Sequence, residues 1–407
     1  MKKVLFVAII ATLIAVGCEK TEIINPNLGT EILFSPELGK LTKADEVAKD
    51  ATLKAQGFKV SAINAYEDLY TTEPEFNTVY REMDNLQFIY GTNGWALQNG
   101  QSYFWPGTGK DLVFLAVSSK TESVEIPEIV ENGFGITGTA VKDSEDNNTG
   151  AYSGITVNNF TIPNFTVTSP SYVKVAGENS NVGDQTGADD DLMVANVVIQ
   201  NQGDNDGVVK GQVKLDFSHT LSKVQFVFTT NTTEDFPVTV NKVEIKDVIN
   251  KATLGVGVSF ANESRTSTNT YDWSPSSDDN DVNYLALKDD DETNKNYVDF
   301  VIDYNLSLDP TATEGLPYAT WLVIPQSLEG KMVSITYTIA DNNNKDEENN
   351  PATSQFTQVF PLYTSTLTSW TRNQYVRYII NLSPNLITFN PVVTEDWSTN
   401  PDVNQNN

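Results

Sequence analysis

Few residues of this chain are of the types that carry out catalysis or bind metals. The single histidine, His219, and the single cysteine, Cys18, are too few for a His/Cys zinc site or for a Ser-His-Asp or Cys-His nucleophile. His219 lies in an alternating segment between Phe217 and Leu221, which favours a packed or hydrogen-bonded histidine over a general base. No glycine-rich phosphate loop follows a predicted strand. We therefore expect no catalytic residues, no cofactor and no enzymatic activity.

The acidic residues give no specific signal for chemistry. With 54 of them, some pair always lies at a distance suited to glycoside hydrolysis. Residues 189–191 and 204–207 offer oxygen ligands for calcium, but neither continues into an EF-hand loop with a terminal Glu. We read both as turn and linker residues and predict no metal site. The formal net charge of −28 repels phosphate backbones, so nucleic acid is excluded as a partner.

The N-terminus has the layout of a lipoprotein signal. Lys2 and Lys3 precede an apolar run over residues 4–16, which is shorter than the about 20 residues of a membrane span. Residues 15–18 match a lipobox, which predicts that Cys18 is acylated and anchors the protein in a lipid bilayer. An exported chain with one cysteine cannot form an internal disulfide, so acylation gives this thiol a role. The alternative is an ordinary signal peptide that contains a cysteine.

Short alternating segments predict an all-β fold. Residues 333–339, 213–217 and 376–382 place apolar side chains on one face and polar ones on the other. Residues 112–117 are apolar on both faces, as in a central strand buried on both sides. The best helix candidate, residues 45–56, is short and mostly polar, so a helix there is marginal. Sheets with one apolar face pack in pairs, which predicts β-sandwiches.

The domain organisation follows from length and from one polar, turn-rich stretch at residues 201–207. We predict a signal peptide (1–17), a lipid-anchored segment (18–43), an N-terminal sandwich (44–202), a linker (203–211), a C-terminal sandwich (212–397) and a polar tail (398–407).

Several segments carry a resemblance to a known family. They are residues 58–66, 94–95, 103–106, 112–116, 191–195, 213–224, 324–326, 370, 375–378, 387–389 and 397. Their order and spacing resemble the fimbrillin-like, Mfa-like surface proteins of Bacteroidetes. The resemblance implies two transthyretin-like β-sandwich domains in tandem. It also implies export as a lipoprotein that Cys18 anchors in the outer membrane at the cell surface, and other fimbrial subunits as partners. In polymerising members, a trypsin-like protease removes the first strand, and a strand of the neighbouring subunit fills the groove that remains.

The resemblance also places the cleavage site. The removable first strand corresponds to Ile32, Leu33 and Phe34. Lys43 and Ala44 stand where the family commonly has an arginine before the alanine, and no arginine precedes Arg81. Release of the strand would therefore need a protease that accepts lysine, at Lys43, Lys40 or Lys49. The alternative is that Lys43 is a solvated loop residue and the protein stays uncut as an anchor.

The apolar residues near the C-terminus are candidates for the donated strand. They are Ile387, Phe389, Val392, Val393 and Trp397. For Ile387 and Phe389 the alternative is a place in the last core strand of the second sandwich.

We expect a structural or adhesive fimbrial subunit with a host or bacterial surface ligand, a glycan or a protein. The alternative is a surface glycan-binding lipoprotein. Its sugar-stacking candidates are Trp95, Tyr103, Trp105, Trp273 and Trp321, although aromatic residues in strands usually belong to the core.

Overall fold

The computed structural model describes residues 30–38, 52–64, 80–105, 112–127, 135–142, 144–145, 148–166, 191–200, 212–249, 251–260, 267–275, 282–285, 300–301, 317–383 and 388–394. These residues are almost entirely β-strand, so the all-β prediction is confirmed. Of the predicted helix, one turn at residues 52–56 is present in the described part. No described helix is long and apolar enough to cross a membrane.

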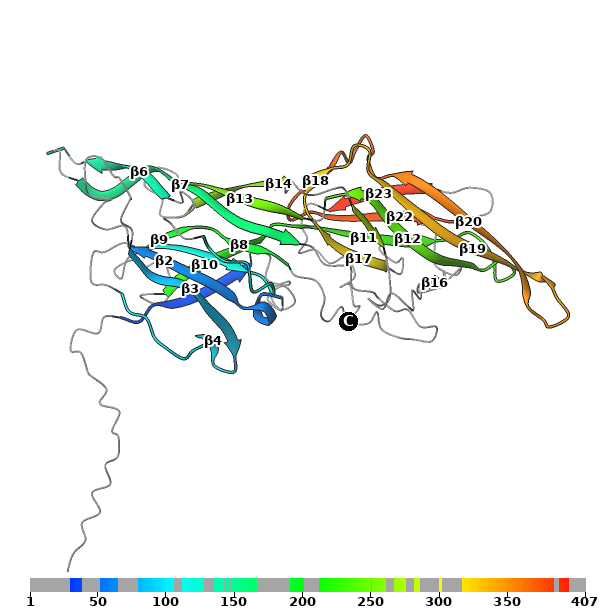
Figure 1. Cartoon of the computed structure of the whole chain (residues 1–407), viewed down its shortest axis with the longest axis horizontal. Coiled ribbons are helices and arrows are strands. Elements are labelled where there is room, and N and C mark those ends of the chain that lie inside the picture. The colour runs from blue at the N-terminus through cyan, green and yellow to red at the C-terminus, as the bar shows by residue number, and fades with distance from the viewer. Residues whose placement is uncertain are drawn as a thin grey trace, which may run out of the picture.

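A curled eight-stranded sheet lies at one end of the elongated molecule (Figure 1). Its strand order is β1-β10-β8-β5-β2-β3-β4, and β9 pairs with β5. The strands are β1 (Leu33–Leu38), β2 (Phe58–Asn64), β3 (Tyr80–Gly91), β4 (Gly94–Leu97), β5 (Leu112–Ser118), β8 (Met193–Ala195), β9 (Val198–Gln200) and β10 (Gln212–His219). Every residue of β5 is buried, which confirms the predicted central strand with two buried faces.

A second sheet covers one face of the first. It consists of β14 (Ser267–Pro275), β13 (Lys251–Phe260), β7 (Asn148–Thr166) and β6 (Gly135–Lys142), in that order. Val113 and Leu115 of β5 belong to one core with Phe160 and Ile162 of β7 and Leu254 of β13. The opposite face of the first sheet encloses a separate, aromatic-rich core.

Two further sheets form a sandwich at the other end of the molecule (Figure 1). One has the order β17 (Pro317–Val323), β11 (Ser222–Thr229), β22 (Tyr375–Asn381), β23 (Thr388–Thr394). The other has the order β15 (Val282–Leu285), β12 (Val238–Val248), β19 (Met332–Lys345), β20 (Pro351–Pro361), with β16 (Phe300–Val301) beside β12. A short pair, β18 (Gln326–Ser327) and β21 (Ser369–Trp370), completes the described strands. Between the two large sheets, the ring of Tyr378 stacks on Phe226 with centroids 5.2 Å apart.

Strand pairing crosses the predicted division of the chain at 203–211. Strand β10 follows that stretch but pairs with β8 before it, and β13 pairs with β7. These pairings differ from the predicted ranges 44–202 and 212–397, because β10, β13 and β14 complete sheets of the first sandwich. Alternation along a strand determines which side chains are buried, but it carries no information on which strand lies beside it.

Buried Tyr378 gives a prediction for the second sandwich. Its hydroxyl accepts a hydrogen bond of 3.0 Å from Nε1 of buried Trp370, so Tyr378→Phe should lower the free energy of unfolding at pH 7 by about 1–3 kcal/mol. Burial raises the pKa of Tyr378 far above its ordinary value. The unfolded chain alone therefore ionises Tyr378 above about pH 10, and the wild-type protein loses stability there. In urea unfolding at pH 7 and pH 10.5, the difference between the two proteins should narrow at the higher pH. A constant difference would contradict this account.

Candidate functional site

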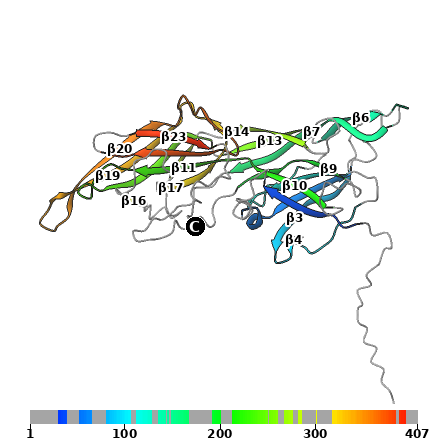
Figure 2. The ribbon, with the colours of Figure 1, turned by 180° about the vertical axis from the view of Figure 1, so that it is seen from behind.

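The first strand is seated in the aromatic-rich core of the first sheet. Ile32, Phe34 and Pro36 are buried, whereas Leu33 and Glu37 are exposed and Ser35 is half-buried. The strand thus shows the alternation of an edge strand with one face on a core. Figure 2 shows β1, in dark blue, beside β10 at the margin of the first sheet.

Phe34 is the centre of the contacts beneath β1. Its ring meets Phe88 of β3 at 4.9 Å, Phe114 of β5 at 5.7 Å and Phe58 of β2 at 6.2 Å, each time nearly edge-on. Such edge-to-face pairs contribute about 0.5–1.5 kcal/mol each beyond the burial of their area. Strands β2, β3 and β5, none of which pairs with β1, therefore form the groove that holds the side chain of Phe34.

The backbone of β1 is held on two sides. From Leu33 onward it pairs in parallel with β10, with Phe34 opposite Val213. Before that, the Ile32 amide donates to the Tyr103 carbonyl at 2.8 Å, and the Trp105 amide donates to the Thr30 carbonyl at 3.0 Å. Removal of β1 would leave the amide of Trp105, the carbonyl of Tyr103 and one edge of β10 without these partners.

A surface ion pair also links β1 to β10. The Nζ atom of Lys214 lies 3.1 Å from Oε2 of Glu37 and 3.3 Å from Oδ1 of Asp216. Partial burial disfavours the charged form of Lys214, but the hydrogen bonds and charges of Glu37 and Asp216 outweigh it and raise the pKa of Lys214. All three groups are well exposed, so the pair contributes at most about 1 kcal/mol.

The chain after β1 is fixed again at residues 52–56. Leu53 is fully buried in the same core as Phe34. The side-chain amide of Gln56 donates to the Asp191 carbonyl at 3.0 Å and accepts from the Asp191 amide at 3.2 Å. The predicted cleavage site, Lys43 and Ala44, lies outside the described residues, between these two fixed points, and Cys18 also lies outside them.

The C-terminal candidates lie on an edge strand. In β23, Phe389 stacks on Phe360 and on Tyr378 at 5.1 Å each and is half-buried. Val392 and Val393 are exposed, at 39% and 36%. Strand β23 pairs with β22 and ends its sheet. Ile387 and Trp397 lie outside the described residues.

One relation between the two ends escaped the sequence analysis. The segment at β1 reads Ile32-Leu33-Phe34-Ser35-Pro36-Glu37-Leu38, and the segment at β23 reads Ile387-Thr388-Phe389-Asn390-Pro391-Val392-Val393. Isoleucine, phenylalanine and proline recur with the same spacing, and two residues after the proline stand Leu38 in one segment and Val393 in the other. A comparison of the two ends of the sequence would have found this signal.

The other predicted residues contribute no reactive site. Nδ1 of His219 lies 2.7 Å from Oδ2 of buried Asp191, which confirms a hydrogen-bonded histidine. Trp105 is buried at 3% exposure, and Trp95 and Trp273 are half-buried against cores. The described residues contain no cluster of three or more metal-ligating side chains. Calcium candidates 189–190 and 204–207 and the side chain of Trp321 fall outside the described part.

Known proteins resemble this chain in sequence profile and in structure. The profile of the family described as "Fimbrillin-like" matches residues 42–397. A fimbrial protein of Bacteroides vulgatus is similar in structure, with 17% identity, a TM-score of 0.50, and 89% of this chain and 98% of that one covered. A fimbrial assembly protein of Parabacteroides distasonis has 10% identity and a TM-score of 0.33, with 90% and 98% covered. No curated protein matches. The matching family consists of fimbrial surface proteins and is not a family of enzymes. Because its profile covers most of the sequence, the chain belongs to the fimbrillin-like family.

Proposed function

We propose that this protein is a structural or adhesive subunit of a surface fimbria and assembles by donor-strand exchange. In this proposal it is exported as a lipoprotein acylated at Cys18, and cleavage after Lys43 releases β1. The C-terminal strand of a neighbouring subunit then occupies the emptied groove. A subunit that stays uncut would remain at the membrane as an anchor.

The observation that carries the proposal is the match between β1 and β23. If β23 takes the place of β1, Phe389 takes the position of Phe34 among three aromatic rings, and Pro391 takes that of Pro36. Proline lacks an amide hydrogen and is confined to the margins of sheets, and both segments contain it at the same point. In the uncut chain the amide of Ile32 donates to the Tyr103 carbonyl, and Ile387 has an amide at the corresponding position of the donated strand.

The energetics favour such an exchange. Ile32 and Phe34 are buried at 5% and 7% exposure, and burial of one large apolar side chain contributes about 1.5–3 kcal/mol. An emptied groove therefore loses roughly 3–6 kcal/mol, which an equivalent strand would restore. Phe389 is only half-buried in its own sheet, so it gains burial in the groove. An added strand also satisfies the open edge of β10.

Cleavage of the purified chain tests the proposal. Brief treatment with a lysine-specific protease should give a new N-terminus at Ala44 and a ladder of oligomers that resists mild SDS. The triple variant Lys40→Ala, Lys43→Ala, Lys49→Ala should remain uncut between β1 and residue 52 and stay monomeric, whereas Lys40→Ala alone should behave like the wild type. A ladder formed by the triple variant, or complete cleavage without any ladder, would contradict the proposal.

A further inference from the structure

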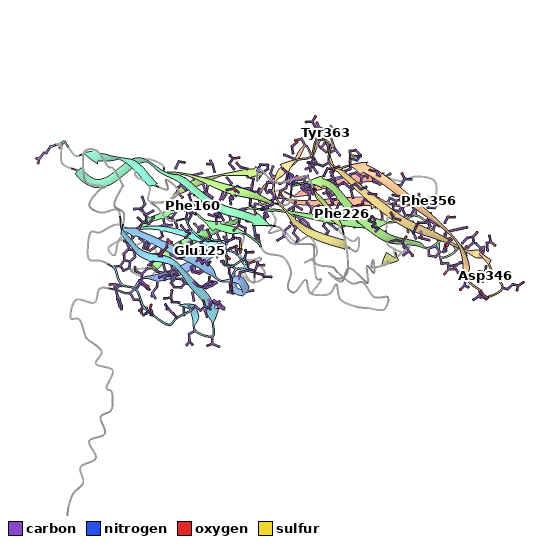
Figure 3. All side chains as sticks on the ribbon, viewed as in Figure 1. Glu125, Phe160, Phe226, Asp346, Phe356 and Tyr363 are labelled. Atoms are coloured by element: carbon purple, nitrogen blue, oxygen red, sulfur yellow. The ribbon has the colours of Figure 1, made fainter. Side chains whose placement is uncertain are left out.

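Strand β20 is a long sheet edge that no other described strand covers, at the far end of the molecule from β1. It pairs only with β19 among the described strands and ends its sheet. Residues 352–357 and Val359 are exposed, so both faces of the strand meet solvent. Figure 3 shows Phe356 on this hairpin, between the body of the sandwich and Asp346 at the tip. The outer edge of β20 therefore presents backbone groups that a further strand can bind.

The strand lacks the charges that usually guard such an edge. The chain has a net charge of −28, yet no residue from Asn349 to Thr371 is charged. Among the described edge strands, β1, β6 and β14 each contain a charged residue. The longest of the other charge-free edges, β17 and β23, have 7 residues each. Strand β20 has 11 residues. Natural sheets blunt exposed edges with lysines, inward charges or prolines, and here no such device interrupts the strand.

The prolines of β20 stand only at its two ends. Each residue between Pro351 and Pro361 has both a backbone N–H and a C=O group, and Phe356 is at the centre of this segment. Two such strands in antiparallel orientation, with Phe356 opposite Phe356, bring the prolines of one copy opposite those of the other. Every residue between the prolines then lies opposite a residue of the second copy, and alternate residues exchange backbone hydrogen bonds with it.

We propose that β20 pairs with β20 of a second copy of this chain, antiparallel and about a two-fold axis at Phe356. Two copies of so acidic a protein repel each other, and this neutral edge allows close approach without placing acidic side chains opposite each other. The same patch faces itself, as a two-fold interface requires. The contact extends the sheet β15-β12-β19-β20 across both copies.

Side chains on both faces of β20 favour this pairing. Phe356, 40% exposed, stacks on Tyr337 of its own sheet at 5.4 Å and meets its counterpart across the axis. Val359, 50% exposed, lies on the opposite face and faces Thr353 of the second copy. Directly opposite aromatic and β-branched residues stabilise a strand pair. The contact does not use the groove of β1, so it is independent of strand exchange.

The register of the pairing can be tested by charge. For the uncut chain without residues 1–17, sedimentation and light scattering should detect a dimer that dissociates on dilution. Thr353→Lys combined with Val359→Lys places lysines opposite each other and should weaken the dimer by roughly tenfold or more. Thr353→Glu combined with Val359→Lys places opposite charges face to face and should restore it. Both positions lie on the solvent-facing side of the strand, so the fold is unaffected.

A matched variant controls for added charge. Thr268→Lys combined with Ser274→Lys adds two lysines at exposed positions of β14 and should leave the dimer intact. A wild-type chain that stays monomeric at about 100 µM would overturn the proposal, and so would equal weakening by both double-lysine variants. Failure of the opposite-charge variant to dimerise would overturn the register.

Discussion

Phe34→Ala should lower the free energy of unfolding of the uncut chain by about 3–5 kcal/mol. Phe34 is 7% exposed, and three aromatic rings surround it within 6.2 Å, so alanine leaves a cavity that these rings cannot fill by small shifts. Urea denaturation followed by tryptophan fluorescence measures the loss. After cleavage at Lys43, the variant should also release β1 faster than the wild type.

Leu33→Ala is the matched control on the same strand. Leu33 is 45% exposed and points away from the core, so its truncation should change stability by about 0.5 kcal/mol or less. Equal effects of the two variants would mean that β1 is not seated through its inward face. The groove would then have no apolar specificity for a replacement strand.

Phe389→Ala should abolish assembly while the monomer stays folded. In its own sheet Phe389 is half-buried, so the monomer should lose roughly 2 kcal/mol of stability. In the position of Phe34 the side chain would be fully buried, and its loss there costs about 3–5 kcal/mol, or more than a hundredfold in affinity. The loss should appear as a missing SDS-resistant ladder after cleavage, and as weak binding of a labelled peptide of residues 384–397 to cleaved protein that lacks β1.

Val392→Ala provides the comparison for this variant. Val392 is 39% exposed in β23 and corresponds to Glu37, which points to solvent in β1. Its truncation should leave both the ladder and the peptide affinity close to the wild type. A peptide with Phe389→Ala that binds as tightly as the natural one would rule out β23 as the donated strand.

The all-β class is predictable from the sequence because the alternation of apolar and polar residues along a strand reflects which side chains are buried. The buried Leu112–Ser118 strand and the hydrogen-bonded His219 follow from residue pattern alone. The neighbours of each strand do not follow from it, because contacts such as β13 with β7 join residues about a hundred positions apart. Alternation leaves their register open until both strands are placed.

The candidate site was predictable only in part. Residues 32–34 are expected from the family resemblance, and the structure adds Pro36 and the groove built by Phe58, Phe88 and Phe114. The hydrogen bonds to Tyr103 and Trp105 and the ion pair with Lys214 depend on which strand ends meet, which is a property of the fold. The likeness of β1 to β23, in contrast, stands in the sequence itself.

The crossing of β13 and β14 onto the first sandwich has a mechanical consequence. Strand β12 lies in one sandwich and β13 in the other, and Ile249 lies between them in the sequence. The Ile249 amide donates to Oε1 of Gln326, and Nε2 of Gln326 donates to the Ile249 carbonyl. Trp273 of β14 further donates to the Thr220 carbonyl at 3.2 Å. A force along the molecule would therefore load many backbone hydrogen bonds between strands at once. A single flexible linker between the sandwiches would instead extend before any strand pair bore the force.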